Sequence, residues 1–132
     1  MFTPVNAFSG FSVRDTDEAA AFYSENLGLE VEHTGMGIIS ITLPGGGHVI
    51  AYPKGDAHVP ASFTILNFAV DDIDEAVDEL NARGIVTKIY DDDSEVTWTD
   101  EKGIGRGKAS GEGPDIAWFR DPSDNILSVL SD

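Results

Sequence analysis

Hydrophobic residues recur at helical spacing in two segments of the chain. They are Ala19, Phe22, Tyr23 and Leu27 in the first segment, and Ile73, Ala76, Val77 and Leu80 in the second. Asp15 with Glu18, and Asp72 with Glu75, precede these runs at the spacing of a helix N-cap and its third residue. A glycine follows each run and is a typical helix stop. The pattern predicts two amphipathic helices, each with one buried face.

An internal repeat relates the two halves of the chain. Residues 11–19 align without gaps to residues 68–76, and six of the nine pairs are identical. In each half a short apolar strand leads into the helix, and further strand-like runs follow. These runs are residues 29–34, 38–43 and 48–52 in the first half, and 85–90, 115–119 and 126–130 in the second. We therefore expect one domain over residues 1–132, with repeat units 5–56 and 63–132.

Residues 91–114 depart from the repeat. The segment begins with an acidic run at 91–93, for which we expect a solvated turn because the ligand spacing of a calcium loop is missing. It continues through Lys102–Lys108, which resembles part of a phosphate loop but lacks the preceding strand and the closing Gly-Lys-Ser/Thr. Its glycine content predicts a mobile or lid-like loop.

The composition narrows the functional classes. The 132 residues suit one domain, and 8 basic against 24 acidic residues give a net charge of −16. This charge argues against nucleic acid or an anionic membrane as a partner, because both require a basic surface. It favours a neutral or cationic small molecule, although adaptation to high salt would also explain it. The absence of cysteine excludes disulfides and thiolate chemistry.

The beginning of the chain carries no basic region followed by a long apolar one, and no apolar run approaches the ~18 residues of a membrane span. We therefore expect a cytoplasmic protein without a membrane partner.

Four motifs together resemble the vicinal oxygen chelate superfamily, which includes glyoxalase I, extradiol dioxygenases, fosfomycin resistance enzymes and bleomycin resistance proteins. The motifs are Phe11-Ser-Val-Arg-Asp15, Phe22-Tyr23, Leu27-Gly-Leu29 and Trp118-Phe-Arg-Asp-Pro-Ser-Asp-Asn125. The resemblance implies an α+β fold in which two βαβββ modules form a curled mixed sheet with helices on the outer face. It also implies a homodimer, whose subunits complete or adjoin a concave cup.

The resemblance further implies four positions for the ligands of a divalent metal. In this chain they correspond to Phe8, Ile65, Ser128 and a position around Ile50 and Ala51. None of these side chains is an imidazole or a carboxylate, which such ions prefer. We therefore expect no metal and no other cofactor. Asp124 stands where the family has glycine, and we expect the closing hairpin to remain intact, because aspartate tolerates a left-handed backbone.

The alternation of side chains along a strand predicts the two faces of each sheet. Phe11 and Val13, with their equivalents Phe68 and Val70, should pack under the helices. If residues 121–125 form a five-residue loop, Trp118 pairs with Ser128. The opposite face then holds a pocket with apolar and polar residues in the proportion typical of a small-molecule site. Its predicted lining is Phe8, Ile50, Ile65 and Trp118, with Ser12, Asn67 and Ser128 as hydrogen-bonding groups.

Other residues with reactive or aromatic side chains give weaker signals. His48 and His58 have no recognised ligand spacing, and His33 is expected to be solvated. Trp98 is interpreted either as a lid over the pocket or as an anchor at a dimer contact. No serine has a histidine that the sequence can place beside it, so no catalytic residue is assigned.

Three functions remain as hypotheses. The first is metal-independent binding of an apolar, aromatic or cationic small molecule in the concave cup, as in the bleomycin-resistance branch. The second is a metal-dependent lyase, isomerase or dioxygenase of the same fold, which would recruit its metal through residues such as His48 or through acids of a partner chain. The third is an accessory domain whose cup is filled by its own side chains.

Overall fold

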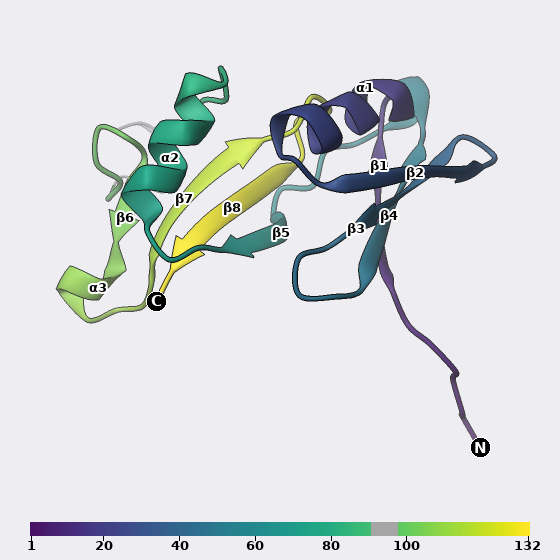
Figure 1. Ribbon diagram of the computed structural model, residues 1–132, viewed down its shortest axis with the longest axis horizontal. Helices are drawn as coiled ribbons and strands as arrows, with labels where there is room; N and C mark the ends of the chain where they lie inside the picture. The colour runs from purple at the N-terminus through teal and green to yellow at the C-terminus, as the bar shows by residue number, and fades with distance from the viewer. Residues whose placement is uncertain (91–97) are drawn as a thin grey trace. The chain divides into compact units, whose positions relative to one another are not determined.

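The computed structural model describes residues 1–90 and 98–132 (Figure 1). The chain divides into two compact units, residues 1–60 and 61–132, and each is described by itself. Each unit consists of a four-stranded mixed sheet and its helices, so the α+β fold of repeated βαβββ units is confirmed. In the described part of the chain, no helix is long and apolar enough to cross a membrane.

The first unit is built around a sheet with the strand order β1-β4-β3-β2. β1 pairs with β4 in parallel, and the remaining neighbours are antiparallel. The strands lie within one residue of the predicted ranges. The elements are β1 (Ser9–Val13), α1 (Thr16–Ala21), a π-helical turn η1 (Phe22–Asn26), β2 (Glu30–Gly35), β3 (Ile38–Thr42), β4 (His48–Pro53) and a 3-10 turn η2 (Gly55–Ala57).

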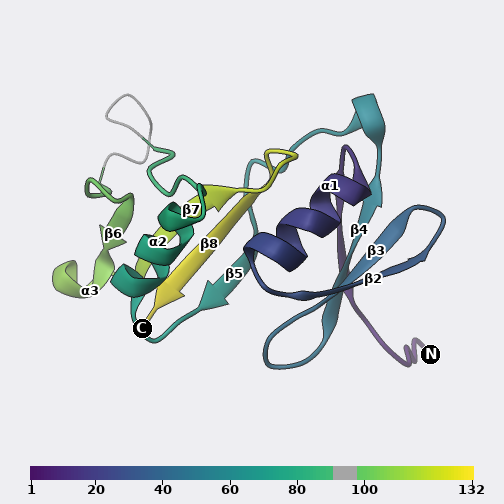
Figure 2. The same ribbon diagram turned by 45° about the horizontal axis from the view of Figure 1, so that its top comes forward.

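The second unit repeats this arrangement with the strand order β5-β8-β7-β6, as Figure 2 shows from a second direction. β5 pairs with β8 in parallel, while β8 with β7 and β7 with β6 are antiparallel. The elements are β5 (Thr64–Ala69), α2 (Ile73–Ala82), β6 (Ile104–Arg106), α3 (Gly107–Ser110), β7 (Asp115–Arg120) and β8 (Ile126–Ser131).

Both helices begin at the predicted aspartates. Asp15 accepts hydrogen bonds from the amides of Asp17 and Glu18, and Asp72 accepts one from the amide of Glu75. α1 contacts β3 and β4, and α2 contacts β7 and β8, so one face of each sheet is covered by a helix. The core lies between helix and sheet and contains the predicted apolar helix positions Ala19, Phe22, Tyr23, Ile73 and Val77.

The prediction of a strand at residues 85–90 is wrong, because the chain has no strand there. Ile85 and Thr87 are nevertheless buried, and the Thr87 hydroxyl donates a hydrogen bond of 2.7 Å to the carbonyl oxygen of Lys102. The Thr87 carbonyl oxygen lies so close to Gly103 that a Cβ there would collide with it. This segment therefore supports the start of β6, and β6 takes the edge position beside β7.

The prediction of a mobile loop over residues 91–114 also needs correction. Residues 104–106 form β6, and residues 107–110 form the short helix α3. An isolated bridge between Thr99 and Gly105 extends the pairing at this edge. The acidic run at 91–93, for which the sequence predicts a solvated turn, lies outside the described residues.

The closing hairpin agrees with its prediction. The amide of Asp121 donates to the carbonyl oxygen of Asn125, and Asp124 has a φ of 64°, the left-handed conformation expected where the family has glycine. β7 and β8 therefore pair with Trp118 opposite Ser128, as the five-residue loop predicted.

Candidate functional site

The seven residues predicted to line a pocket are distributed over both units. Phe8 directly precedes β1, and the other six lie on strands of the two sheets. One face of each sheet is covered by a helix, and we call the other face the open face. The first unit carries Phe8, Ser12 and Ile50, and the second carries Ile65, Asn67, Trp118 and Ser128.

Three of these residues form a row across the second sheet. Asn67 on β5 pairs with Ser128 on β8, and Ser128 pairs with Trp118 on β7. Residues paired in this way point to the same face of a sheet. The neighbours Ala117, Phe119, Leu127 and Val129 are buried on the opposite, helix-covered face. The row therefore lies on the open face.

The Trp118 indole lies across the central strand of this row. Its Nε1 donates a hydrogen bond of 3.1 Å to Oγ1 of Thr64 on β5, although β8 lies between β5 and β7. Beneath it, the Ser128 hydroxyl donates to Oδ1 of Asn67 at 2.5 Å, and Ser128 is 0% exposed. Two of the three polar groups predicted to meet a ligand, Asn67 and Ser128, are thus bonded to one another, and the indole forms the surface above Ser128.

Two further aromatic rings pack against Trp118. The ring centroid of Tyr90 lies 5.4 Å from that of Trp118, and the Trp98 centroid lies 5.6 Å from it, both in T-shaped geometry. Trp98 is 57% exposed and occupies the space above Gly105, where any Cβ would collide with the indole. We call Tyr90, Trp98 and Trp118 the aromatic cluster. Sequence reasoning missed Tyr90, because the strand expected at 85–90 hid its position.

The open face of the first sheet carries two histidine contacts. The ring of Phe8 stacks on that of His48, with centroids 5.0 Å apart and an interplanar angle of 27°. The oxygen of Ser12 lies 2.8 Å from Nδ1 of His58, so the expectation that no histidine stands beside a serine is wrong. The turn through η2 causes this, because it returns the chain from the end of β4 toward β1. The spacing is that of a hydroxyl and a base in a nucleophilic pair.

The side chains do not fit the metal site that the family resemblance implies. The corresponding positions offer an aromatic ring at Phe8, hydrocarbon at Ile50 and Ile65, and a hydroxyl at Ser128 that is already hydrogen-bonded. His48 contacts Phe8, and His58 contacts Ser12. Phe8 and Ser12 are four residues apart, which corresponds to about 13 Å of extended chain. Among the described residues, no group of three or more His, Cys, Asp or Glu side chains could hold a metal ion.

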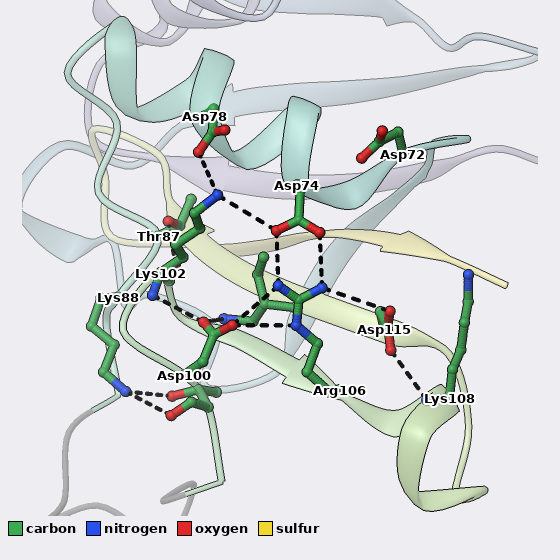
Figure 3. Close-up of polar contacts among 12 residues, drawn as sticks. Asp72, Asp74, Asp78, Thr87, Lys88, Asp100, Lys102, Arg106, Lys108 and Asp115 are labelled. Atoms are coloured by element: carbon green, nitrogen blue, oxygen red, sulfur yellow. Dashed lines mark hydrogen bonds and ion pairs between the residues drawn. The ribbon is translucent and has the colours of Figure 1, made fainter.

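The helix-covered side of the second unit carries a cluster of ion pairs centred on Arg106 (Figure 3). Arg106 on β6 donates two hydrogen bonds, of 2.8 and 2.9 Å, to the carboxylate of Asp74 on α2. It also lies 3.2 Å from a carboxylate oxygen of Asp100 and 3.9 Å from one of Asp115. Lys102 adds an ion pair of 2.8 Å to Asp78. We call this group the Arg106 cluster.

The contacts of the Arg106 cluster shift the pKa of Asp74 and that of Lys102. The hydrogen bond from Arg106, reinforced by its charge and by Lys102, lowers the pKa of Asp74 to about 2. The hydrogen bonds and charges of Asp78 and Asp74 raise the pKa of Lys102. These pairs join α2 to β6. Lys102 and Arg106 therefore neutralise acids of the same unit.

The repeated units define a class of α+β proteins built from paired βαβββ modules. The family model described as the Glyoxalase/Bleomycin resistance protein/Dioxygenase superfamily matches residues 7–129, and the chain belongs to this superfamily. No curated protein matches the sequence.

Solved structures of the superfamily resemble this chain in fold. The fosfomycin resistance protein FosX from Listeria monocytogenes has a TM-score of 0.66 at 13% identity, with 100% of this chain and 95% of that chain covered. TnmS3, an antibiotic binding protein from Streptomyces sp. CB03234, has a TM-score of 0.61 at 20% identity, with 98% of both chains covered. A superfamily member from Sphaerobacter thermophilus has a TM-score of 0.65 at 22% identity, covering 97% of this chain and 98% of that chain.

Proposed function

We propose that this protein binds an apolar or aromatic small molecule on the open face of the second sheet, without a metal ion. The observation that carries the proposal is the aromatic cluster. It places the exposed ring of Trp98 against Trp118 on a sheet face that none of the described helices of its own unit covers. A cationic ligand, the third class predicted from the sequence, is favoured only by the net charge of −16.

The chemistry around the aromatic cluster supports this proposal. Ile116, Ile126 and Leu130 are half-buried and share the open face with Trp118. Thr64 and Asn67 supply hydrogen-bonding groups at the β5 side. A mostly apolar surface with a few fixed polar groups is typical of small-molecule sites.

The residues at the metal-ligand positions of the family and the similar solved structures also support the binding proposal. The positions equivalent to the metal ligands of the family carry no imidazole or carboxylate in this chain, so binding is expected to proceed without a metal. TnmS3 is an antibiotic binding protein and FosX is a fosfomycin resistance protein, so small molecules are recognised on this fold.

The family resemblance also underlies our proposal of a cytoplasmic homodimer. A mass in solution equal to the 14.1 kDa of one chain would contradict the dimer.

Intrinsic fluorescence tests the binding proposal directly. The chain contains two tryptophans, and both belong to the aromatic cluster, so a ligand that contacts the cluster changes the emission. Chelator-treated protein is titrated with a panel of neutral and charged polycyclic aromatic compounds. We expect saturable quenching, and a loss of affinity of about tenfold or more in Trp118→Ala, because the central aromatic ring of the cluster is lost.

Tyr52→Ala is the matched control, because Tyr52 is an exposed aromatic residue of the first sheet. It should bind as the unmodified protein does, and circular dichroism confirms the folding of both variants. Unchanged affinity of Trp118→Ala for every bound compound would place the site elsewhere. Binding that appears only after one equivalent of zinc, nickel, iron or manganese is retained would instead support the metal-dependent enzyme.

A further inference from the structure

Arg120 lies on the same face as the aromatic cluster. It is the last residue of β7, pairs with Ile126 and stands two residues after Trp118. Side chains two residues apart on a strand point to the same face, with their Cα atoms about 7 Å apart. The side chain of Arg120 is exposed. The open face of the second sheet therefore presents a guanidinium next to an indole.

Arg120 differs from the other three arginines in its contacts. Arg14 pairs with Glu18 at 3.3 Å, Arg83 with Glu79 at 2.7 Å, and Arg106 holds the ion-pair cluster. Within residues 1–90 and 98–132, the side chain of Arg120 forms no hydrogen bond or ion pair. This is unusual in a chain with 24 acidic residues.

The nearest acid in the sequence is committed to the hairpin turn. Oδ1 of Asp121 accepts hydrogen bonds of 2.8 and 3.0 Å from the amides of Ser123 and Asn125. Oδ2 accepts a third, of 3.1 Å, from the side-chain amide of Asn125. Asp121 is buried, whereas Arg120 is exposed. The carboxylate of Asp121 is therefore engaged in stabilising the turn.

Among the described residues, the acids that α2 and the strands of the second sheet contribute lie on the helix-covered side of that sheet. β5, β7 and β8 contain a single acidic residue, Asp115, whose carboxylate faces Arg106 in the cluster of Figure 3. Asp74 and Asp78 project from α2 toward the same cluster. Charges more than about 10 Å away are largely screened at 0.1 M salt, so a nearby guanidinium has more influence on the charge of a bound ligand than distant acids have.

We propose that the ligand is an aromatic anion, whose ring contacts the aromatic cluster and whose carboxylate, phosphate or sulfonate group binds Arg120. This inference rests on the proposed function and assigns the charge of its ligand. A guanidinium donates two parallel hydrogen bonds to such a group, and the spacing between Arg120 and Trp118 suits a ring that carries its anionic group directly or on a short linker.

Three probes with the same ring system separate charge from aromatic contact. They are 2-naphthoate, 2-naphthamide and 2-naphthylmethylammonium, each titrated into the full chain by calorimetry in 0.1 M salt. We expect the naphthoate to bind roughly tenfold more tightly than the amide, and the ammonium more weakly than both, because a hydrogen bond to a charged group adds that much affinity. In Arg120→Gln the naphthoate should fall to the affinity of the amide, whose own affinity stays unchanged.

The control is Arg83→Gln, which removes a positive charge from the α2 side of the same unit and should alter none of the three affinities. Tightest binding of the amide or the ammonium, or unchanged naphthoate binding in Arg120→Gln, would overturn the charge assignment. If Trp118→Ala still weakens all three probes in that case, the proposed function stands. If no probe binds, or if Trp118→Ala binds them normally, the proposed function fails and this inference fails with it.

Discussion

The two units share a plan but differ in how they form the outer edge of the sheet. In the first unit, β2 begins at Glu30, two residues after the glycine that ends the helical segment. In the second unit, β6 begins at Ile104, twenty residues after Gly84. β2 has six residues and β6 has three, so the second edge has fewer strand hydrogen bonds of its own.

Contacts from outside the strand compensate for the shortness of β6. Gly103, Gly105 and Gly107 alternate along this segment, and a Cβ at any of them would collide with a neighbour. The neighbours are the Thr87 backbone, the Trp98 ring and the backbone at Gly113 and Pro114, in that order. The glycine spacing that resembles a phosphate loop is therefore explained by close packing. The repeat sets the strand–helix unit, whereas local packing determines the edge.

Substitution at Gly103 should have the largest effect on this difference between the edges. Gly103→Ala places a methyl group against the Thr87 carbonyl and also requires a side chain at a φ of +85°. Because the obstacle is backbone, we expect a loss of about 3 kcal/mol or more in the free energy of unfolding, measured by urea denaturation.

Gly45→Ala, in the turn between β3 and β4 of the first unit, is the matched control. Its φ is +90°, but a Cβ there has nothing within 4 Å, so only the backbone strain of about 1–2 kcal/mol remains. Equal losses in the two variants would show that the packing of β6 on Thr87 contributes nothing, and that the two edges are equally tolerant.

Much of the fold follows from local rules that operate within a few residues. The N-caps at Asp15 and Asp72 and the hairpin that pairs Trp118 with Ser128 depend on short-range spacing, and all were predicted correctly. The edge strand of the second unit was not, because residues 85–90 have the alternation of a strand. Thr87 is buried because it contacts Lys102 and Gly103 and not because it lies in a strand. The hydrogen bond to Lys102 joins residues fifteen positions apart, and the periodicity of the sequence does not reveal such a contact.

The sequence predicted which face of the sheet the candidate site residues share, but it did not predict how their side chains contact one another. Strand alternation and loop length placed Asn67, Ser128 and Trp118 in one row on the open face. They do not indicate that the indole crosses β8 and covers Ser128, because that depends on the hydrogen bond to Thr64. In the first unit, the turn at η2 placed His58 beside Ser12, which are forty-six residues apart in the sequence.

Removal of the positive charge of Arg106 should have the second largest effect on the stability of the second sheet edge. Arg106→Gln leaves the carboxylates of Asp74, Asp100 and Asp115 close together without the charge that they share. The Arg106 side chain is 40% exposed, so solvent screening limits the expected loss to about 1 kcal/mol in the free energy of unfolding. Hydrogen exchange at the amides of β6 should accelerate more than exchange in β2.

Arg83→Gln provides the comparison, because its side chain is similarly exposed at 42% but pairs with one carboxylate in the i, i+4 arrangement. Its expected cost is about 0.3–0.5 kcal/mol. An equally small loss in the free energy of unfolding for Arg106→Gln would mean that the cluster stabilises the protein no more than a single surface ion pair does. β6 would then be held in place by the glycine contacts alone.

Lowering the pH should destabilise the β6 edge by protonating Asp74. We expect a smaller effect than in Gly103→Ala or Arg106→Gln. The pKa of this carboxyl is lowered from 3.8 to about 2, chiefly by its hydrogen bond with Arg106. A lowered pKa in the folded state means that the stabilisation is complete above pH 3.8 and is lost as the pH falls toward 2. Thermal unfolding of Asp74→Asn should therefore occur below that of the unmodified protein at pH 6. The gap in Tm should narrow between pH 4 and pH 2, since both proteins then lack the charge. A gap that stays constant over this range would show that Asp74 acts through packing, and the acid sensitivity of the second edge would need another source.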